Sequence, residues 1–107
     1  MPSSLVEIVV LETTIDHAGA QRLLERVERV IASSPGAILL DLTTVAAIDP
    51  VALPVFLQAI GDGQSGTSLT VVASQPHIRT LLLGAREFGS ARLVATRSAA
   101  IRALKST

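Results

Sequence analysis

Two carboxylates are the residues of this chain whose placement could most readily support chemistry. Asp41 and Asp49 frame one stretch of the sequence, and paired carboxylates serve either as acid–base groups or as ligands of a metal ion. Asp41 closes a run of apolar residues and Asp49 stands directly before Pro50, so a structural role is available to each. The stretch contains no third ligand, and the sequence therefore predicts neither a metal site nor a cofactor.

The other reactive residues favour a protein that is not an enzyme. His17 and His77 each stand at the start of an expected helix, and a chain with no cysteine offers them no partners at the spacing of a metal site. The segment Gly61–Gly66 matches the glycine pattern of dinucleotide-binding loops, but that pattern must follow a strand and open a helix. Here a helix precedes it and a strand follows it, so we interpret the segment as a flexible loop. The chain also lacks the G-x-S-x-G motif of a nucleophile elbow.

Two threonines follow the apolar run that contains Asp41. Thr43 and Thr44 carry hydroxyl groups that a kinase could phosphorylate. Threonine is also common in strands, and the nearby carboxylate of Asp49 would repel an added phosphate. We therefore interpret both threonines as ordinary loop residues.

Alternating strand and helix patterns must position these residues. Short runs rich in Val, Ile and Leu indicate buried strands, and between the first two lies a clear helical periodicity, with Leu23 and Val27 on one face and Asp16 as its expected cap. A third helix should end at Gly84 in a left-handed conformation. The order predicts an α/β fold with a mainly parallel sheet and flanking helices. The expected strands are 5–11, 37–42, 69–73 and 91–95, and the expected helices are 17–32, 50–60, 76–83 and 97–105.

Two prolines make the start of the second helix ambiguous. Asp49 could cap this helix with Pro50 as its first residue. Pro54 would then lie in the second turn, where it removes a backbone hydrogen bond. The alternative, which we favour, is a separate tight turn over residues 50–53 and a helix that starts at Pro54.

Composition limits the class of partner. Nine basic and nine acidic residues leave the 107-residue chain without net charge, and its only aromatic residues are two Phe, so no nucleic-acid surface is expected. No apolar run is long enough to insert in a membrane, and residues 1–4 lack the features of a secretory signal. We expect a single domain, residues 1–107, located in the cytoplasm.

The stretch around Asp41 and Asp49 resembles the STAS domain, the family of anti-sigma-factor antagonists. The family pattern is an apolar strand with Asp-Leu-(Ser/Thr), a short loop, and Asp-Ser-(Ser/Thr)-Gly-Leu at the start of a helix. Residues 40–43 read Leu-Asp-Leu-Thr, and residues 49–53 read Asp-Pro-Val-Ala-Leu. The resemblance covers most of the chain. It implies a STAS-like fold with a mixed, mainly parallel sheet of about four to five strands flanked by about four helices.

The chain departs from the family at the position of its phosphorylation switch. The phosphorylated Ser or Thr of the family is the second residue after the loop Asp, and this position is Val51. Pro50 replaces the preceding Ser, and Ala52 replaces the following Gly. The resemblance therefore implies partner binding without the usual phosphorylation at this site.

The resemblance implies a non-catalytic protein-interaction module in bacterial transcription regulation or related signalling. The partner would be an anti-sigma factor or a kinase-like regulator, bound through the loop 43–53, the helix after it and the turn 74–78. Some apolar residues of the loop, such as Val45, could instead pack into the core. The loop residues expected to contact the partner are Thr43, Thr44, Asp49, Pro50, Val51, Ala52 and Leu53.

Two other functions stay open at this point. One is a small STAS subunit of an ABC-type lipid transporter complex, bound to the ATPase subunit. The other is a small-ligand sensor with a pocket near residues 43–53. The sequence also leaves a homodimer open.

Overall fold

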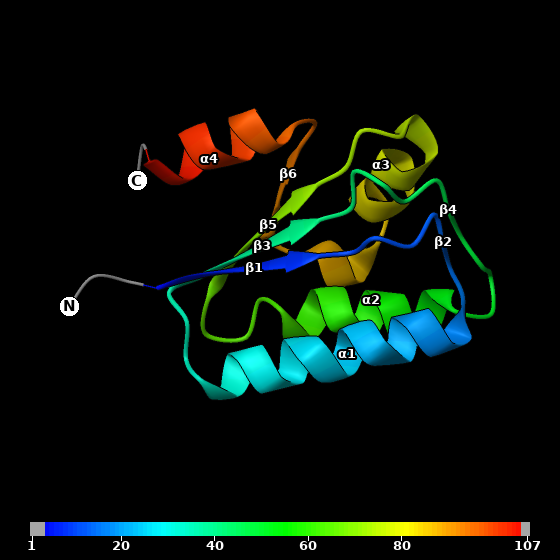
Figure 1. Ribbon diagram of the computed structural model, residues 1–107, viewed down its shortest axis with the longest axis horizontal. Coiled ribbons are helices and arrows are strands. Elements are labelled where there is room, and N and C mark those ends of the chain that lie inside the picture. Colours follow the sequence, from blue (N-terminus) through cyan, green and yellow to red (C-terminus); the bar gives the residue numbers. More distant parts are fainter. Residues whose placement is uncertain (1–3, 106–107) are drawn as a thin grey trace.

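The computed structural model describes residues 4–105, which form a parallel sheet with helices on both faces (Figure 1). Strands and helices alternate, as the sequence predicts. In chain order the elements are β1 (Leu5–Val9), β2 (Thr14–Ile15), α1 (His17–Ala32), β3 (Ala37–Asp41), β4 (Ala47–Ile48), α2 (Leu53–Asp62), β5 (Ser68–Val72), α3 (Pro76–Leu83), the 3-10 helix η1 (Arg86–Phe88), β6 (Arg92–Val94) and α4 (Arg97–Lys105).

The main sheet has the strand order β1-β3-β5-β6, and each of its strand pairs is parallel. Ile8, Leu40 and Val71 lie side by side across its first three strands. A second sheet pairs the short strands β2 and β4, also in parallel. The predicted class, an α/β fold with a mainly parallel sheet and four α-helices, is confirmed. The short strands β2 and β4 and the helix η1 were not predicted.

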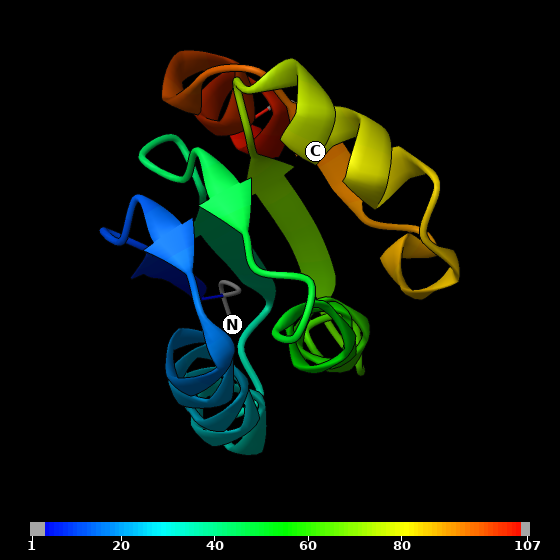
Figure 2. The ribbon, with the colours of Figure 1, turned by 90° about the vertical axis from the view of Figure 1, so that its right-hand side faces the viewer.

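The two faces of the sheet are covered by different helices. Successive side chains of a strand point to opposite faces. Ile38 and Leu40 therefore join the main core with α1 and α2, while Leu39 packs with Val72 and with Ala100 of α4. Figures 1 and 2 show α1 and α2 side by side below the sheet and α4 above it.

Helix α1 has the predicted bounds, His17–Ala32. The side chain of Asp16 caps it, because Oδ1 accepts a hydrogen bond from the backbone N of Gly19 at 2.7 Å. This bond satisfies an amide that has no partner inside the helix. The predicted inner face is buried and carries Leu23 and Val27.

Some local predictions are wrong. Gly84 follows α3 with φ −86° and ψ −7°, which is not a left-handed conformation. Helix α3 ends there because Ala85 is extended and leads into η1. The loop expected from Gly61 begins later, since α2 continues to Asp62. The first strand was expected to reach residue 11 and ends at Val9. Strand β5 still follows this loop, so no helix start faces it as a dinucleotide site would require.

Within residues 4–105, no helix combines the length and the apolar character needed to cross a membrane. The expectation that the chain lacks a secretory signal rests on residues 1–4, and residues 1–3 lie outside the part that the structure describes.

Candidate functional site

Asp41 holds the start of the loop that follows β3. Its Oδ1 accepts two hydrogen bonds from Thr43, one from the backbone N at 2.9 Å and one from the hydroxyl Oγ1 at 2.7 Å. Its Oδ2 lies 3.4 Å from Nη1 of Arg97, and Arg97 also forms an ion pair with Glu7. The carboxylate therefore connects β3, the loop and α4, and its role is structural.

The loop over residues 43–49 is held by backbone hydrogen bonds to the segment that precedes α1. The carbonyl of Thr13 accepts a bond from the N of Ala46 at 2.7 Å, and the carbonyl of Ile15 accepts one from the N of Asp49 at 2.9 Å. Between these bonds, β4 pairs with β2. A loop fixed along its length loses little conformational freedom when a partner binds it.

Helix α2 begins at Leu53, after a tight turn. The N of Ala52 donates to the carbonyl of Asp49 at 2.9 Å, and the N of Leu53 donates to the carbonyl of Pro50 at 3.3 Å. The favoured alternative is confirmed in that a tight turn precedes the helix, but the helix begins at Leu53, one residue before the predicted Pro54. Pro54 lies in the first helical turn, where its missing N–H costs little. The other alternative, in which the Asp49 carboxylate caps a helix that begins at Pro50, is wrong. Ala52 is the N-cap residue, so Asp49 lies too far before the first turn to reach its free amides.

An exposed apolar residue stands at the tip of this turn. Val51 is 72% exposed, and the exposed Pro50 and Pro54 lie close to it in the sequence. Prolines fix φ and so restrict the backbone of the tip. Ala52, the next residue, is completely buried in the main core. The tip therefore presents Val51 to solvent from a base that is anchored in the core.

The other predicted contact residues differ in exposure. Thr43, Thr44 and Asp49 are exposed, and Leu53 is half-buried. Val45 and Ala52 have no exposed area, and a side chain without exposed area cannot touch a partner in this conformation. We therefore leave Val45 and Ala52 out of the candidate surface. The partner-binding role of the remaining residues stays a prediction.

The start of α3 lies beside the loop. Nε2 of His77 forms a hydrogen bond with the carbonyl of Ala46. Figure 1 shows the loop and α3 at the same end of the molecule, beyond the carboxyl ends of the strands, where α/β proteins commonly bind their ligands. We call the exposed residues at this end the loop surface. It consists of Thr43, Thr44, Ala47, Asp49, Pro50, Val51, Pro54 and residues 74–77.

The sequence did not predict the contacts that Arg97 and His77 make. Arg97 is 56 residues from Asp41, and His77 is 31 residues from Ala46, so no local pattern connects them. The available signal was their position, because both residues stand at helix starts that follow strands. The carboxyl ends of parallel strands meet at one edge of a sheet, and such helix starts are brought together there.

The loop surface has the character of a contact surface. Among the described residues, no three His, Asp or Glu side chains are grouped so that they could hold a metal ion. The hydroxyl of Thr43 is engaged by Asp41, and the tip is apolar. A surface with a fixed backbone and an exposed apolar tip among polar neighbours suits binding to another protein.

A family model of the STAS domain matches residues 4–104. The chain belongs to the STAS domain family. A comparison with curated proteins found no match. Among solved structures, this STAS domain is similar to the anti-sigma factor antagonist SpoIIAA in its unphosphorylated form, with a TM-score of 0.69 and 15% sequence identity. The match covers 100% of this chain and 94% of that one, and at this identity it shows a common fold.

Proposed function

We propose that this STAS domain is a protein-interaction module of the anti-sigma-factor-antagonist type, which binds its partner through the loop surface. We also propose that it is not switched by phosphorylation at the family position. The observation that carries the proposal is Val51, which is 72% exposed at the tip of the turn and has no hydroxyl group. The partner would be an anti-sigma factor or a kinase-like regulator in the cytoplasm of a bacterium.

The physical support for partner binding is the combination of an apolar tip and a fixed backbone. Burying an exposed valine completely contributes about 1.5 kcal/mol or more. The hydrogen bonds that the carbonyls of Thr13 and Ile15 accept hold the loop before any partner arrives, so little of this energy is lost in ordering the chain. Val51 is therefore expected to be an anchor residue of the interface.

The support for an unswitched module is the chemistry of the same residue. A phosphate at this tip would add about two negative charges beside Asp49 and would repel or recruit a partner. Val51 offers no oxygen for a phosphoryl group, and Pro50 before it offers none either. The loop surface is therefore proposed to bind without this form of control.

A pull-down from the native cell tests the surface. The tagged full chain is compared with the variants Val51→Asp and Leu83→Asp. Leu83 is 65% exposed at the end of α3 and lies outside the loop surface, so it is a matched control. Val51→Asp is expected to weaken partner binding by about tenfold or more, because the new charge must be desolvated, and Leu83→Asp is expected to retain it. Equal recovery of the same proteins by both variants would show that the surface is wrongly placed.

The identity of the captured protein separates the remaining alternatives. An anti-sigma factor or kinase supports the proposed function, whereas an ABC-type ATPase subunit supports a role in a transporter complex. The ligand-sensor alternative requires a pocket near residues 43–53. A pocket of the structure that lies between β1 and α1 has no lining residue in this loop, so it does not support that alternative.

A phosphorylation assay tests the missing switch. The wild type and Val51→Ser are incubated with the captured kinase and ATP and are analysed by intact-protein mass spectrometry. Phosphate is expected on the serine variant and not on the wild type. Stoichiometric phosphate on any residue of the wild type, including Thr44, would contradict an unswitched module.

A further inference from the structure

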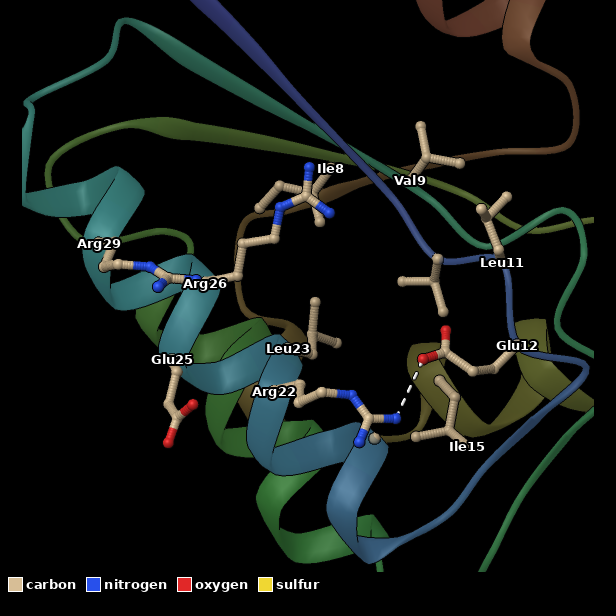
Figure 3. Close-up of a pocket in the computed structure, with 12 residues that line it drawn as sticks. Ile8, Val9, Leu11, Glu12, Ile15, Arg22, Leu23, Glu25, Arg26 and Arg29 are labelled. Carbon is tan, nitrogen blue, oxygen red and sulfur yellow. Dashed lines mark hydrogen bonds and ion pairs between the residues drawn. The ribbon is translucent and has the colours of Figure 1, made fainter.

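A groove runs between β1 and α1 and shares no residue with the loop surface (Figure 3). Its volume is about 700 Å³. Its apolar residues include Ile8 of β1, Val10 just after β1, and Leu23 of α1. The groove follows β1, which is the first strand in the order of the main sheet and therefore an edge strand.

Arginines of α1 line the groove. Arg22, Arg26 and Arg29 lie along the helix at spacings that place them on one side, and Figure 3 shows the side chains of Arg22 and Arg26 extending from α1 toward β1. Arg22 forms an ion pair with Glu12 at 3.3 Å. Among the described residues, Arg26 and Arg29 form no ion pair. Three arginines face two glutamates, Glu12 and Glu25, so the groove has a positive balance.

The outer edge of β1 carries backbone groups that have no strand partner among residues 4–105. The carbonyl of Ser4 accepts a hydrogen bond from the N of Gly36 at 2.9 Å, and the N of Val10 donates one to the carbonyl of Asp41 at 3.0 Å. Both bonds lie on the side of β1 that faces β3. Backbone groups of a strand alternate between its two sides. The even-numbered residues therefore face β3, and the odd-numbered residues of β1 direct their N–H and C=O groups outward.

No described strand pairs with this outward edge. Leu5, Val9 and the following Leu11 are also exposed, by 42%, 39% and 73%. Natural sheets usually protect such an edge with charge, proline or a bulge. The one charged residue of β1 is Glu7, and its carboxylate is paired with Arg97, so the edge carries no free charge.

We propose that this groove is a second binding site, which takes up an extended, acidic segment of a partner protein by strand addition to β1. The added strand would lie about 4.8 Å from β1 and bond to its outward backbone groups. Alternate side chains of the segment would point toward α1, where carboxylates meet Arg26 and Arg29. The intervening side chains would point to the opposite face, where apolar groups contact the exposed Leu5 and Val9. The recognised pattern is therefore an alternation of acidic and apolar residues.

Charge decides against a second copy of this chain as the occupant. Pairing of two β1 edges about a two-fold axis would place both α1 helices on the same face of the joined sheet. The arginine rows at Arg22, Arg26 and Arg29 would then approach each other, and like charges at an interface disfavour association. An acidic segment meets the same arginines with attraction.

A peptide titration tests the site on the full chain. The probe is a fluorescently labelled heptapeptide in which valine and glutamate alternate, and the comparison peptide alternates valine and lysine. Fluorescence anisotropy is expected to show saturable binding of the first peptide alone, and this binding should weaken as salt is added. Absence of binding at millimolar glutamate peptide, or equal binding of the lysine peptide, would overturn the proposal.

Two further measurements separate strand addition from simple charge attraction. The double variant Arg26→Glu/Arg29→Glu should weaken binding of the peptide by about tenfold or more. The control is the double variant Arg86→Glu/Arg102→Glu, which makes the same change of charge on exposed residues outside the groove. It should weaken binding by less than about twofold. Peptides N-methylated on all valines or on all glutamates block opposite edges of the probe. One set should abolish binding and the other should preserve it, because only one edge pairs with β1.

The remaining outcomes are also decisive. Equal effects of the two double variants, or of the two N-methylated peptides, would exclude strand addition guided by the α1 arginines. Sedimentation equilibrium of the wild-type chain is expected to show a monomer in the absence of peptide. A dimer that is broken by the peptide would identify a second copy as the natural occupant and would overturn the proposal. Because no residue is shared with the loop surface, failure of either site leaves the other unaffected.

Discussion

Replacing Asp41 by alanine is expected to lower the free energy of unfolding by about 2–3 kcal/mol, because the carboxylate accepts two hydrogen bonds that fix the start of the loop. A hydrogen bond to a charged group contributes about 1.5–3 kcal/mol when it is buried, and we take about 1 kcal/mol for each bond because Thr43 is exposed and regains water when the acceptor is removed. The contact with Arg97 adds less than about 1 kcal/mol, since that side chain is 46% exposed and the distance is 3.4 Å.

Conservative variants divide this loss into its parts. Asp41→Asn keeps an oxygen that can accept both bonds and loses only the charge, so it should cost about 1 kcal/mol. Thr43→Val removes the hydroxyl bond and keeps the shape of the side chain, and it should also cost about 1 kcal/mol. When Asp41 is already alanine, the Thr43 hydroxyl has no acceptor, and the further change Thr43→Val should cost almost nothing. The coupling energy should therefore be about 1 kcal/mol.

Urea unfolding followed by far-UV circular dichroism measures the wild type and all four variants. A domain of this size has a total stability of about 5–15 kcal/mol, so each variant should stay folded without denaturant. The slope of the transition should be unchanged, because none of the substitutions alters the area exposed on unfolding. Equal losses for Asp41→Ala and Asp41→Asn, or a coupling energy near zero, would refute the role assigned to the Thr43 hydrogen bonds.

The remaining predictions concern the core, the first helix and the tip of the loop. Phe56→Ala should cost about 3–5 kcal/mol, because the ring is completely buried, while Phe56→Leu should cost much less; calorimetry measures both. Asp16→Ala should cost about 1 kcal/mol through loss of the α1 cap, and Asp16→Asn should restore most of it in the same urea assay. Val51→Asp should change the free energy of unfolding by less than about 0.5 kcal/mol, because the residue is exposed. Ala52→Asp places a charge in the core, and its NMR spectrum should lose the dispersed amide signals of the native fold. Similar spectra for these two variants would contradict the burial described at the tip.

Local signals explain which parts of the fold were predictable. Helix α1 was predicted with its correct bounds because its apolar residues repeat at helical spacing and Asp16 supplies a cap within the same segment. The tight turn before α2 was predictable because Pro54 lacks the N–H that the second turn of a helix beginning at Pro50 would need. The conformation of Gly84 was not predictable in this way. Its φ depends on how Ala85 and η1 continue the chain, and glycine accepts either hand.

The candidate site shows the same division. The motif around Asp41 and Asp49 indicated the STAS family, and the loss of the phosphate acceptor at Val51 follows from residue identity alone. The sequence did not separate Val51 from Ala52, which are both small and apolar. The structure exposes the first and buries the second, because the turn before α2 directs successive side chains to opposite sides.

The sequence by itself determined the alternation of strands and helices, the cap at Asp16 and the missing hydroxyl at Val51, because each depends on residues that are neighbours along the chain. Only the tertiary structure decided that Arg97 meets Asp41, that His77 meets Ala46, and that the arginines of α1 line the free edge of β1. These contacts join segments that are far apart in the sequence. They form because a parallel sheet brings the carboxyl ends of its strands to one edge and leaves β1 unpaired at its side, and no local pattern of residues records that placement.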